Sequence, residues 1–136
     1  MEEFKNHIFQ IKIQDGILFI EFFKEFIDYS DIDAGIKKRL EMVKGRSFPI
    51  LTDLSAVKMA SPEARKRMAD KDGEIGVTAV AIVIRSKIQR ILWDIFRCTY
   101  KKQMPVKAFT NKEKAYNWIE KYKQKSPEPA VDRIIE

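Results

Sequence analysis

The stretch VTAVAIVI, residues 77–84, decides the fold that we expect for this chain. It holds no charged residue and is rich in valine and isoleucine, which strands favour. A strand with one face in water alternates apolar and polar residues, and this stretch does not. We therefore predict a strand covered on both faces, at the centre of a sheet with helices above and below.

A long amphipathic pattern at residues 87–102 follows the strand. One apolar stripe recurs at steps of three and four residues, as expected of a helix that faces a sheet. A second stripe, rotated by about 100°, makes the apolar surface wider than such a helix requires. The second stripe consists of Trp93, Phe96 and Tyr100.

Turn and cap signals divide the rest of the chain. Asp15-Gly16 between two apolar runs predicts a hairpin, because this turn needs positive φ. Ser61-Pro62-Glu63 supplies a serine cap, a proline at the first helical position and an acidic first turn. The remaining elements are expected as a hairpin at 7–24, helices at 26–45, 61–72 and 110–122, and strands at 48–54 and 105–110.

The predicted order is therefore β-β-α-β-α-β-α-β-α. Strands that alternate with helices favour right-handed crossovers and a mainly parallel sheet, to which the hairpin adds antiparallel pairing. The prediction is an α/β class fold with a mixed sheet, in a single domain over residues 1–124. Residues 125–136, with two prolines, are expected to form a loosely held tail.

Composition limits the class of protein. The 136 residues are 45% hydrophobic and 34% charged, which is typical of a globular domain. Cys98 is the single cysteine and favours a reducing compartment. The acidic start, Met1-Glu2-Glu3, does not resemble a secretion signal, and no apolar run approaches the roughly 20 residues of a membrane span. We expect a cytoplasmic protein. The net charge of +6 comes without a nucleic-acid motif, so no nucleic-acid partner is expected.

The sequence shows no set of residues typical of catalysis. His7 lies at the start of a strand, and Cys98 reads as a small residue within a helix. The sequence shows no metal-ligand spacing and no glycine-rich phosphate loop, so we predict no cofactor, no metal and no enzyme activity. Asp53 stands at the carboxyl end of a strand, where parallel sheets place ligands. Its alternative role is that of a loop carboxylate that accepts backbone N–H groups.

Two segments carry a family resemblance. TDLSAV at residues 52–57, followed by a loop and the helix start at Ser61, resembles the signature of STAS domains, which have the SpoIIAA-like fold. VKAFT at residues 106–110, then Ala115 and Trp118-Ile119, resembles the ending of small STAS-like and SEC14-like bacterial proteins of unassigned function. The resemblance covers about residues 8–122 and implies a regulatory module.

Regulated members of that family carry a phosphorylated serine at the start of this helix. Here the corresponding tetrad is Ser61-Pro62-Glu63-Ala64, so the phosphorylated serine is replaced by Glu63, or by Pro62 if the register shifts by one. Ser61 remains, and its hydroxyl is expected to cap the helix.

The first functional hypothesis is a non-catalytic module that binds an unidentified protein partner. The resemblance places the recognition surface on the loop after residue 54 and on the helix that follows it, which has few apolar residues and an exposed basic cluster. The interaction surface is predicted to comprise Asp53, Ser55, Lys58, Met59, Ser61, Glu63, Arg65, Lys66 and Arg67.

The alternative hypothesis is a carrier or sensor of a small apolar ligand, which is implied by the SEC14-like side of the resemblance. Aromatic side chains would line its pocket, namely Phe19, Phe22, Phe23, Phe26, Trp93, Phe96 and Tyr100. Aromatic stripes at helical spacing also form ordinary core. As a third option, Trp93, Phe96 and Tyr100 form a homodimer interface, because a wide apolar helix face favours a partner.

Overall fold

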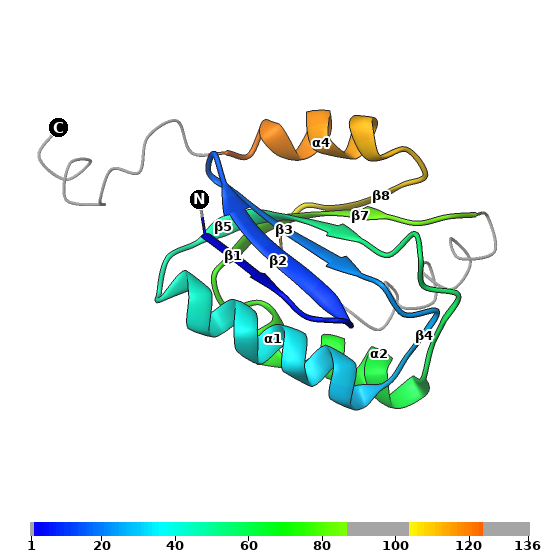
Figure 1. Cartoon of the computed structure of the whole chain (residues 1–136). Helices are drawn as coiled ribbons and strands as arrows, with labels where there is room; N and C mark the ends of the chain where they lie inside the picture. Colours follow the sequence, from blue (N-terminus) through cyan, green and yellow to red (C-terminus); the bar gives the residue numbers. More distant parts are fainter. Residues whose placement is uncertain (1, 87–103, 124–136) are drawn as a thin grey trace, which may run out of the picture.

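The structure is a computed structural model that describes residues 2–86 and 104–123. Its centre is a six-stranded sheet in the order β1-β2-β3-β5-β7-β8, with α1 and α2 on one face and α4 on the other (Figure 1). Strands β4 and β6 pair separately at one end. The elements are β1 (Glu2–Lys5), β2 (Phe9–Gln14), β3 (Ile17–Phe22), β4 (Phe26–Ile27), α1 (Tyr29–Val43), β5 (Phe48–Asp53), β6 (Met59–Ala60), α2 (Pro62–Met68), the 3-10 turn η1 (Lys71–Gly73), β7 (Val77–Val83), β8 (Val106–Phe109) and α4 (Lys112–Glu120).

The sheet is mixed. Strands β1, β2 and β3 pair antiparallel, and β3, β5, β7 and β8 pair parallel. The predicted α/β class with a mainly parallel mixed sheet is confirmed. The strand expected at residues 77–84 is β7, but it lies next to the edge strand β8 and not at the centre. The reason is that β1, β2 and β3 all extend the sheet on the opposite side. Strand β1 and the β4–β6 pair are not among the predicted elements.

The predicted hairpin is present as β2 and β3. Asp15 has φ 53° and Gly16 has φ 79°, so both turn residues take the left-handed conformation that a two-residue hairpin turn requires. The register pairs Lys12 with Phe19 and Gln14 with Ile17.

Helix α1 spans Tyr29–Val43, within the segment 26–45 that was expected to carry it. Asp28 is the N-cap, and the Asp31 carboxylate accepts a hydrogen bond from the Asp28 backbone N–H at 3.0 Å. Gly35 faces the sheet at close range, because a Cβ there would lie 3.3 Å from Phe22 Cζ. Helix α2 is shorter than expected, since Met68 ends it and η1 follows.

The sheet buries a separate core on each face. On the α4 side the core comprises Ile17, Leu51, Ala79, Ala81, Val83, Ala115 and Ile119. On the α1 side it comprises side chains from β2, β3, β5 and α1, among them Phe9, Ile11, Leu18, Phe22 and Ile32. None of the helices in the described ranges is long and apolar enough to span a membrane.

Some predictions fall on residues outside the described ranges. They are the helix at 87–102 with Cys98, the stripe of Trp93, Phe96 and Tyr100, and the tail at 125–136.

Candidate functional site

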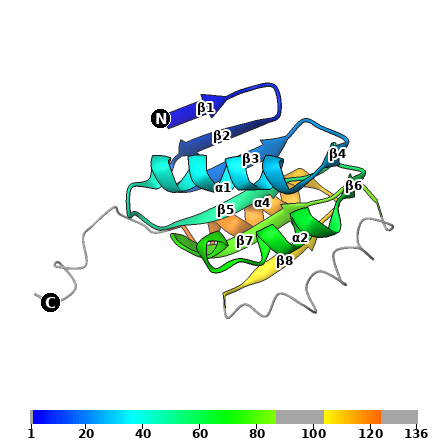
Figure 2. The ribbon, with the colours of Figure 1, turned by 90° about the horizontal axis from the view of Figure 1, so that it is seen from below.

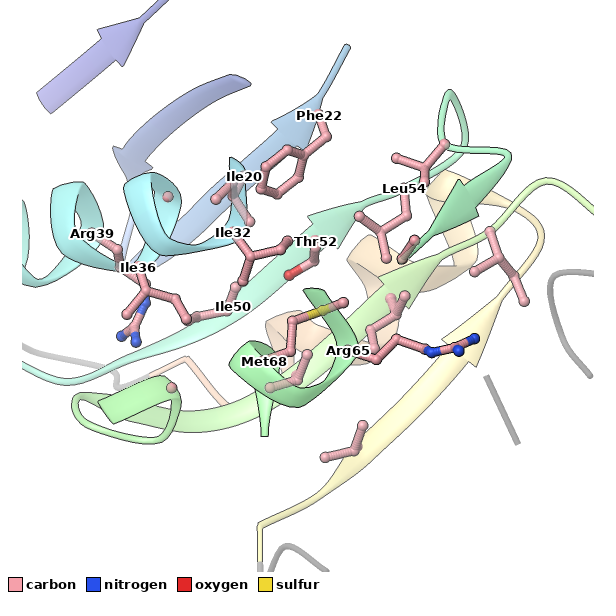
Figure 3. A pocket seen from close by; sticks show the side chains of 18 of the residues that line it. Ile20, Phe22, Ile32, Ile36, Arg39, Ile50, Thr52, Leu54, Arg65 and Met68 are labelled. Carbon is pink, nitrogen blue, oxygen red and sulfur yellow. The ribbon is translucent and has the colours of Figure 1, made fainter. Parts of the chain in front are cut away.

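An apolar cavity of about 220 Å³ lies between the sheet and helices α1 and α2. Figure 3 shows side chains from α1, α2 and the strands directed toward it. Aliphatic side chains supply most of its wall, including Ile20, Ile32, Ile36, Ile50, Met68, Val80, Ile82 and Val106. Apolar enclosures of this kind are where small ligands usually bind, although ligand pockets are commonly about 300 Å³ or larger.

Two arginines border this cavity and differ in their contacts. Arg39 is buried, and its Nη1 and Nη2 donate to the carbonyls of Ile75 and Asp72 at 2.6 and 3.0 Å. Arg65 on α2 is half-buried and makes no ion pair with any residue that the structure describes. Arg65 is therefore a cation available to the mouth of the cavity.

Of the predicted aromatic residues that lie in the described part of the chain, only Phe22 lines this cavity. Phe19 lies on the opposite face of the sheet and stacks on Tyr116, with ring centroids 6.2 Å apart. Phe23 is 36% exposed and lies near Lys5. The aliphatic residues that form the wall were recognised in the sequence only as general core positions.

A second feature is the exposed ladder formed by β4 and β6. Phe26 pairs directly with Met59 in parallel register, and the two residues are 62% and 57% exposed. Ile27 next to Phe26 is buried and anchors the ladder to the core. Lys58 forms an ion pair with Glu25 at 2.6 Å. We call Phe26, Lys58 and Met59 the β4–β6 surface.

Lys58 and Met59 belong to the predicted interaction surface, whereas Phe26 belongs to the predicted pocket. Phe26 is exposed because it lies in the two-residue strand β4. The helical pattern after residue 26 gave no indication of this strand. Short strands like this one leave almost no periodic signal in a sequence.

Asp53 is buried at the carboxyl end of β5. Its Oδ1 accepts from the Ser55 backbone N–H at 2.9 Å and from Ser55 Oγ at 2.6 Å, and its Oδ2 lies 3.3 Å from Lys112 Nζ. These contacts satisfy the carboxylate within the fold and connect the loop after β5 to α4. This geometry matches the alternative role of Asp53 as a loop carboxylate, and Ser55 serves the same turn.

Ser61 caps α2 as expected, with its Oγ accepting the Ala64 backbone N–H at 3.0 Å. Glu63 is exposed in the first turn of this helix. Ser61 and Glu63 lie directly after β6, so they adjoin the β4–β6 surface in the chain.

Arg67 does not belong to an exposed basic cluster, contrary to the prediction. It is 5% exposed and lies on the same side of α2 as the buried Ala64. Its Nε contacts Asp33 Oδ1 at 3.0 Å, and its two Nη atoms contact the Asp72 carboxylate at 2.6 and 2.8 Å. Asp70 lies 3.3 Å from Nη1. Arg67 therefore joins α2 to α1 and η1.

The Arg67 guanidinium stabilises the charged form of its partners. Its hydrogen bonds lower the pKa of Asp72 below the ordinary value of 3.8. The pKa of Asp33 is also lowered, mainly by its hydrogen bond to Lys37 and to a smaller extent by its hydrogen bond to Arg67. The same carboxylates raise the pKa of Arg67. The cluster is a satisfied ionic clamp and has no free carboxylate pair. Within residues 2–86 and 104–123, no group of three His, Cys, Asp or Glu side chains could hold a metal ion.

Comparison with known proteins places this fold in a family. Residues 11–123 match the family described as a domain of unknown function, DUF7793. The chain belongs to the DUF7793 family. Among solved structures, this DUF7793 domain is similar to an uncharacterized protein of the DUF3478 family with a SpoIIAA-like fold, from Shewanella loihica PV-4. The two chains are 15% identical with a TM-score of 0.64, over 88% of this chain and 99% of the other.

No curated protein matches the chain. The structural likeness confirms the predicted SpoIIAA-like fold. An identity of 15% shows the fold alone. The function therefore has to be argued from the residues of this chain.

Proposed function

We propose that this DUF7793 domain is a non-catalytic regulatory module that binds another protein through the β4–β6 surface. One observation carries the proposal, namely the direct pairing of Phe26 and Met59, two apolar residues that are each more than half exposed. Large apolar side chains that are exposed singly need no explanation, whereas contiguous exposed apolar surface marks interaction sites, and this adjacent pair would be the centre of such a surface.

The surroundings of this pair support the proposal. Lys58 and Glu25 supply a charged border, which is the usual arrangement of an apolar interface centre with a polar rim. The backbone is fixed, because Glu25 O accepts from the N–H groups of Lys58 and Met59 at 2.7 and 3.1 Å. A surface that is already ordered loses little conformational entropy when a partner binds.

The direct test is photo-cross-linking in cells of the source organism. A benzoylphenylalanine at position 59 is expected to capture one reproducible protein, and the additional change Phe26→Ser is expected to abolish that product. Position 75 provides the matched control, since Ile75 is 55% exposed but lies in the loop before β7. The same product from position 75, or no product from position 59, would contradict the proposal.

The second candidate function is binding of a small apolar molecule in the cavity. The favouring observation is the apolar wall beside Arg65, a cation without an ion pair in the described part of the chain. A ligand with a short aliphatic body and a carboxylate would match both features, because a charged hydrogen bond at the rim adds to apolar burial.

Calorimetry with decanoate and decanol separates these contributions. Decanoate is expected to bind more tightly than decanol, and Arg65→Gln is expected to remove that preference. Val80→Trp should abolish binding of both because it fills the cavity, whereas Ile75→Trp, outside the cavity, should not. Equal binding to wild type and Val80→Trp would exclude this cavity as the site.

A further inference from the structure

Strand β1 forms one edge of the sheet. Its only neighbour among the described strands is β2, and Figure 2 shows it at the margin of the sheet, outside the span of α1. The strand is well anchored, because Arg46 donates from two nitrogens to the Glu2 carboxylate, both at 2.9 Å. A fixed edge strand presents a row of unpaired backbone groups.

The register shows which backbone groups face outward. The Asn6 N–H donates to Phe9 O at 3.0 Å, so Asn6 points toward β2. Backbone direction alternates along an antiparallel strand, so Phe4, which is paired with Ile11, points toward β2 as well. The N–H and C=O groups of Glu3 and Lys5 therefore point away from the sheet.

We propose that β1 pairs antiparallel with β1 of a second copy of this chain, about a twofold axis that passes by Phe4. In this register Glu3 lies opposite Lys5 of the second copy, and Phe4 lies opposite Phe4. The outward N–H and C=O groups of Glu3 and Lys5 then form four hydrogen bonds across the axis. The two sheets become one continuous sheet, in a closed dimer with a self-complementary interface.

Charge selects this register. Glu3 and Lys5 share one face of the strand, and each meets the opposite charge in the second copy. A shift by one residue in each copy would place Glu3 opposite Glu3 or Lys5 opposite Lys5. Like charges directly opposite each other are destabilising, so both neighbouring registers are disfavoured. Charged residues normally keep an edge strand from pairing with another chain. Here Glu3 and Lys5 of one copy are complementary to Lys5 and Glu3 of the other.

Phe4 supplies the apolar part of the interface. In a single copy it is half-buried, packs on Phe9 with ring centroids 5.7 Å apart and lies under Lys38 Nζ at 4.3 Å. In the dimer the two Phe4 residues form a non-hydrogen-bonded pair, where opposed side chains approach most closely. Because only three residues of β1 on each side, Glu3, Phe4 and Lys5, face β1 of the other copy, we expect a dissociation constant on the order of 10–100 µM.

Sedimentation equilibrium of the full chain tests the inference. Wild type is expected to pass from monomer to dimer over this concentration range. Glu3→Lys places lysines at positions 3 and 5, and Lys5→Glu places glutamates at both, so each variant alone should associate at least tenfold more weakly. An equimolar mixture of the two variants should regain the wild-type affinity as a heterodimer. The double variant, with the charges exchanged, should do the same as a homodimer.

A proline test addresses the backbone. Lys5→Pro removes an N–H that faces outward and leaves the β1–β2 hydrogen bonds intact, so it should weaken the dimer at least tenfold. Thermal unfolding of dilute samples verifies that every variant is folded. A monomer at all concentrations, single variants that associate like wild type, or a mixture that associates no better than its components would each overturn the inference. None of these outcomes affects the proposed function, since β1 contributes nothing to the β4–β6 surface.

Discussion

The two faces of the sheet are packed in different ways. On the α4 side, β7 contributes the small residues Ala79 and Ala81, both fully buried, and α4 packs over them with Ala115 and Ile119. On the other side, β7 contributes the larger Val80 and Ile82, Ile84 follows directly after the strand, and a cavity of about 220 Å³ remains among the described residues. Among the residues that the structure describes, one strand thus supports a closely packed face, called closed below, and a face with a cavity, called open below.

The difference shows how α2 is held without much apolar contact. Its buried residues are Ala64 and Arg67, so a satisfied cation takes the place of a large aliphatic side chain. Arg67 attaches α2 to α1 and η1 by ion pairs, and Arg39 attaches α1 to the backbone near η1. We infer that the α4 face supplies more of the stability than the α1/α2 face does.

The largest effect is expected from Leu51→Ala on the closed face. Leu51 is 1% exposed beneath α4, and its truncation should leave a cavity in a tightly packed region. The free energy of unfolding should fall by about 3–4 kcal/mol. Urea denaturation followed by circular dichroism measures it. A loss below about 1 kcal/mol would mean that this face is not closely packed.

A smaller loss is expected from Arg67→Met, which removes the clamp of the open face. The predicted cost is about 2–3 kcal/mol at neutral pH, less than for a fully buried pair because its carboxylate partners are partly exposed. Lys66→Met on the exposed side of α2 is the matched control and should change stability by less than about 0.5 kcal/mol.

The effect of Arg67→Met on stability should depend on pH. Because the pKa of Asp72 is lowered in the folded protein, its stabilising effect is complete above the ordinary value of 3.8 and is lost as the pH falls through the lowered value. The stability difference between wild type and Arg67→Met should be constant above about pH 5 and should shrink below about pH 4. A difference that is unchanged at low pH would show that Arg67 acts by packing alone.

Removing the helix caps compares the two faces on a finer scale. Ser61→Ala deprives the Ala64 N–H of its acceptor, and Asn111→Ala does the same to the Lys114 N–H at the start of α4. Each should cost about 1 kcal/mol in thermal unfolding. If Ser61→Ala has no effect while Asn111→Ala does, then α2 contributes nothing to global stability.

Much of this fold could be predicted from residue patterns. The Asp15-Gly16 turn, the Ser61 cap and the apolar run of β7 each have a local cause, and local causes are visible in a sequence. Strand β1 was missed because three of its four residues are charged, so it lacks the apolar alternation of a half-buried strand.

The candidate site was less accessible to prediction. Met59 was expected on an interaction surface, but its pairing with Phe26 depends on two strands of two residues each. Arg67 was assigned to the surface because arginine usually lies there, whereas its burial depends on Asp33, which is 34 residues away in the chain. Contacts between distant segments of this kind leave no signature in composition or periodicity.

The most direct test of the contrast between the faces is a pair of neighbouring substitutions on β7, measured by urea denaturation. Val80→Leu extends into the cavity and should change the free energy of unfolding by less than about 0.5 kcal/mol. Ala81→Leu pushes against α4 and should cost about 3 kcal/mol. Equal losses from both substitutions would contradict a closed α4 face and an open α1/α2 face.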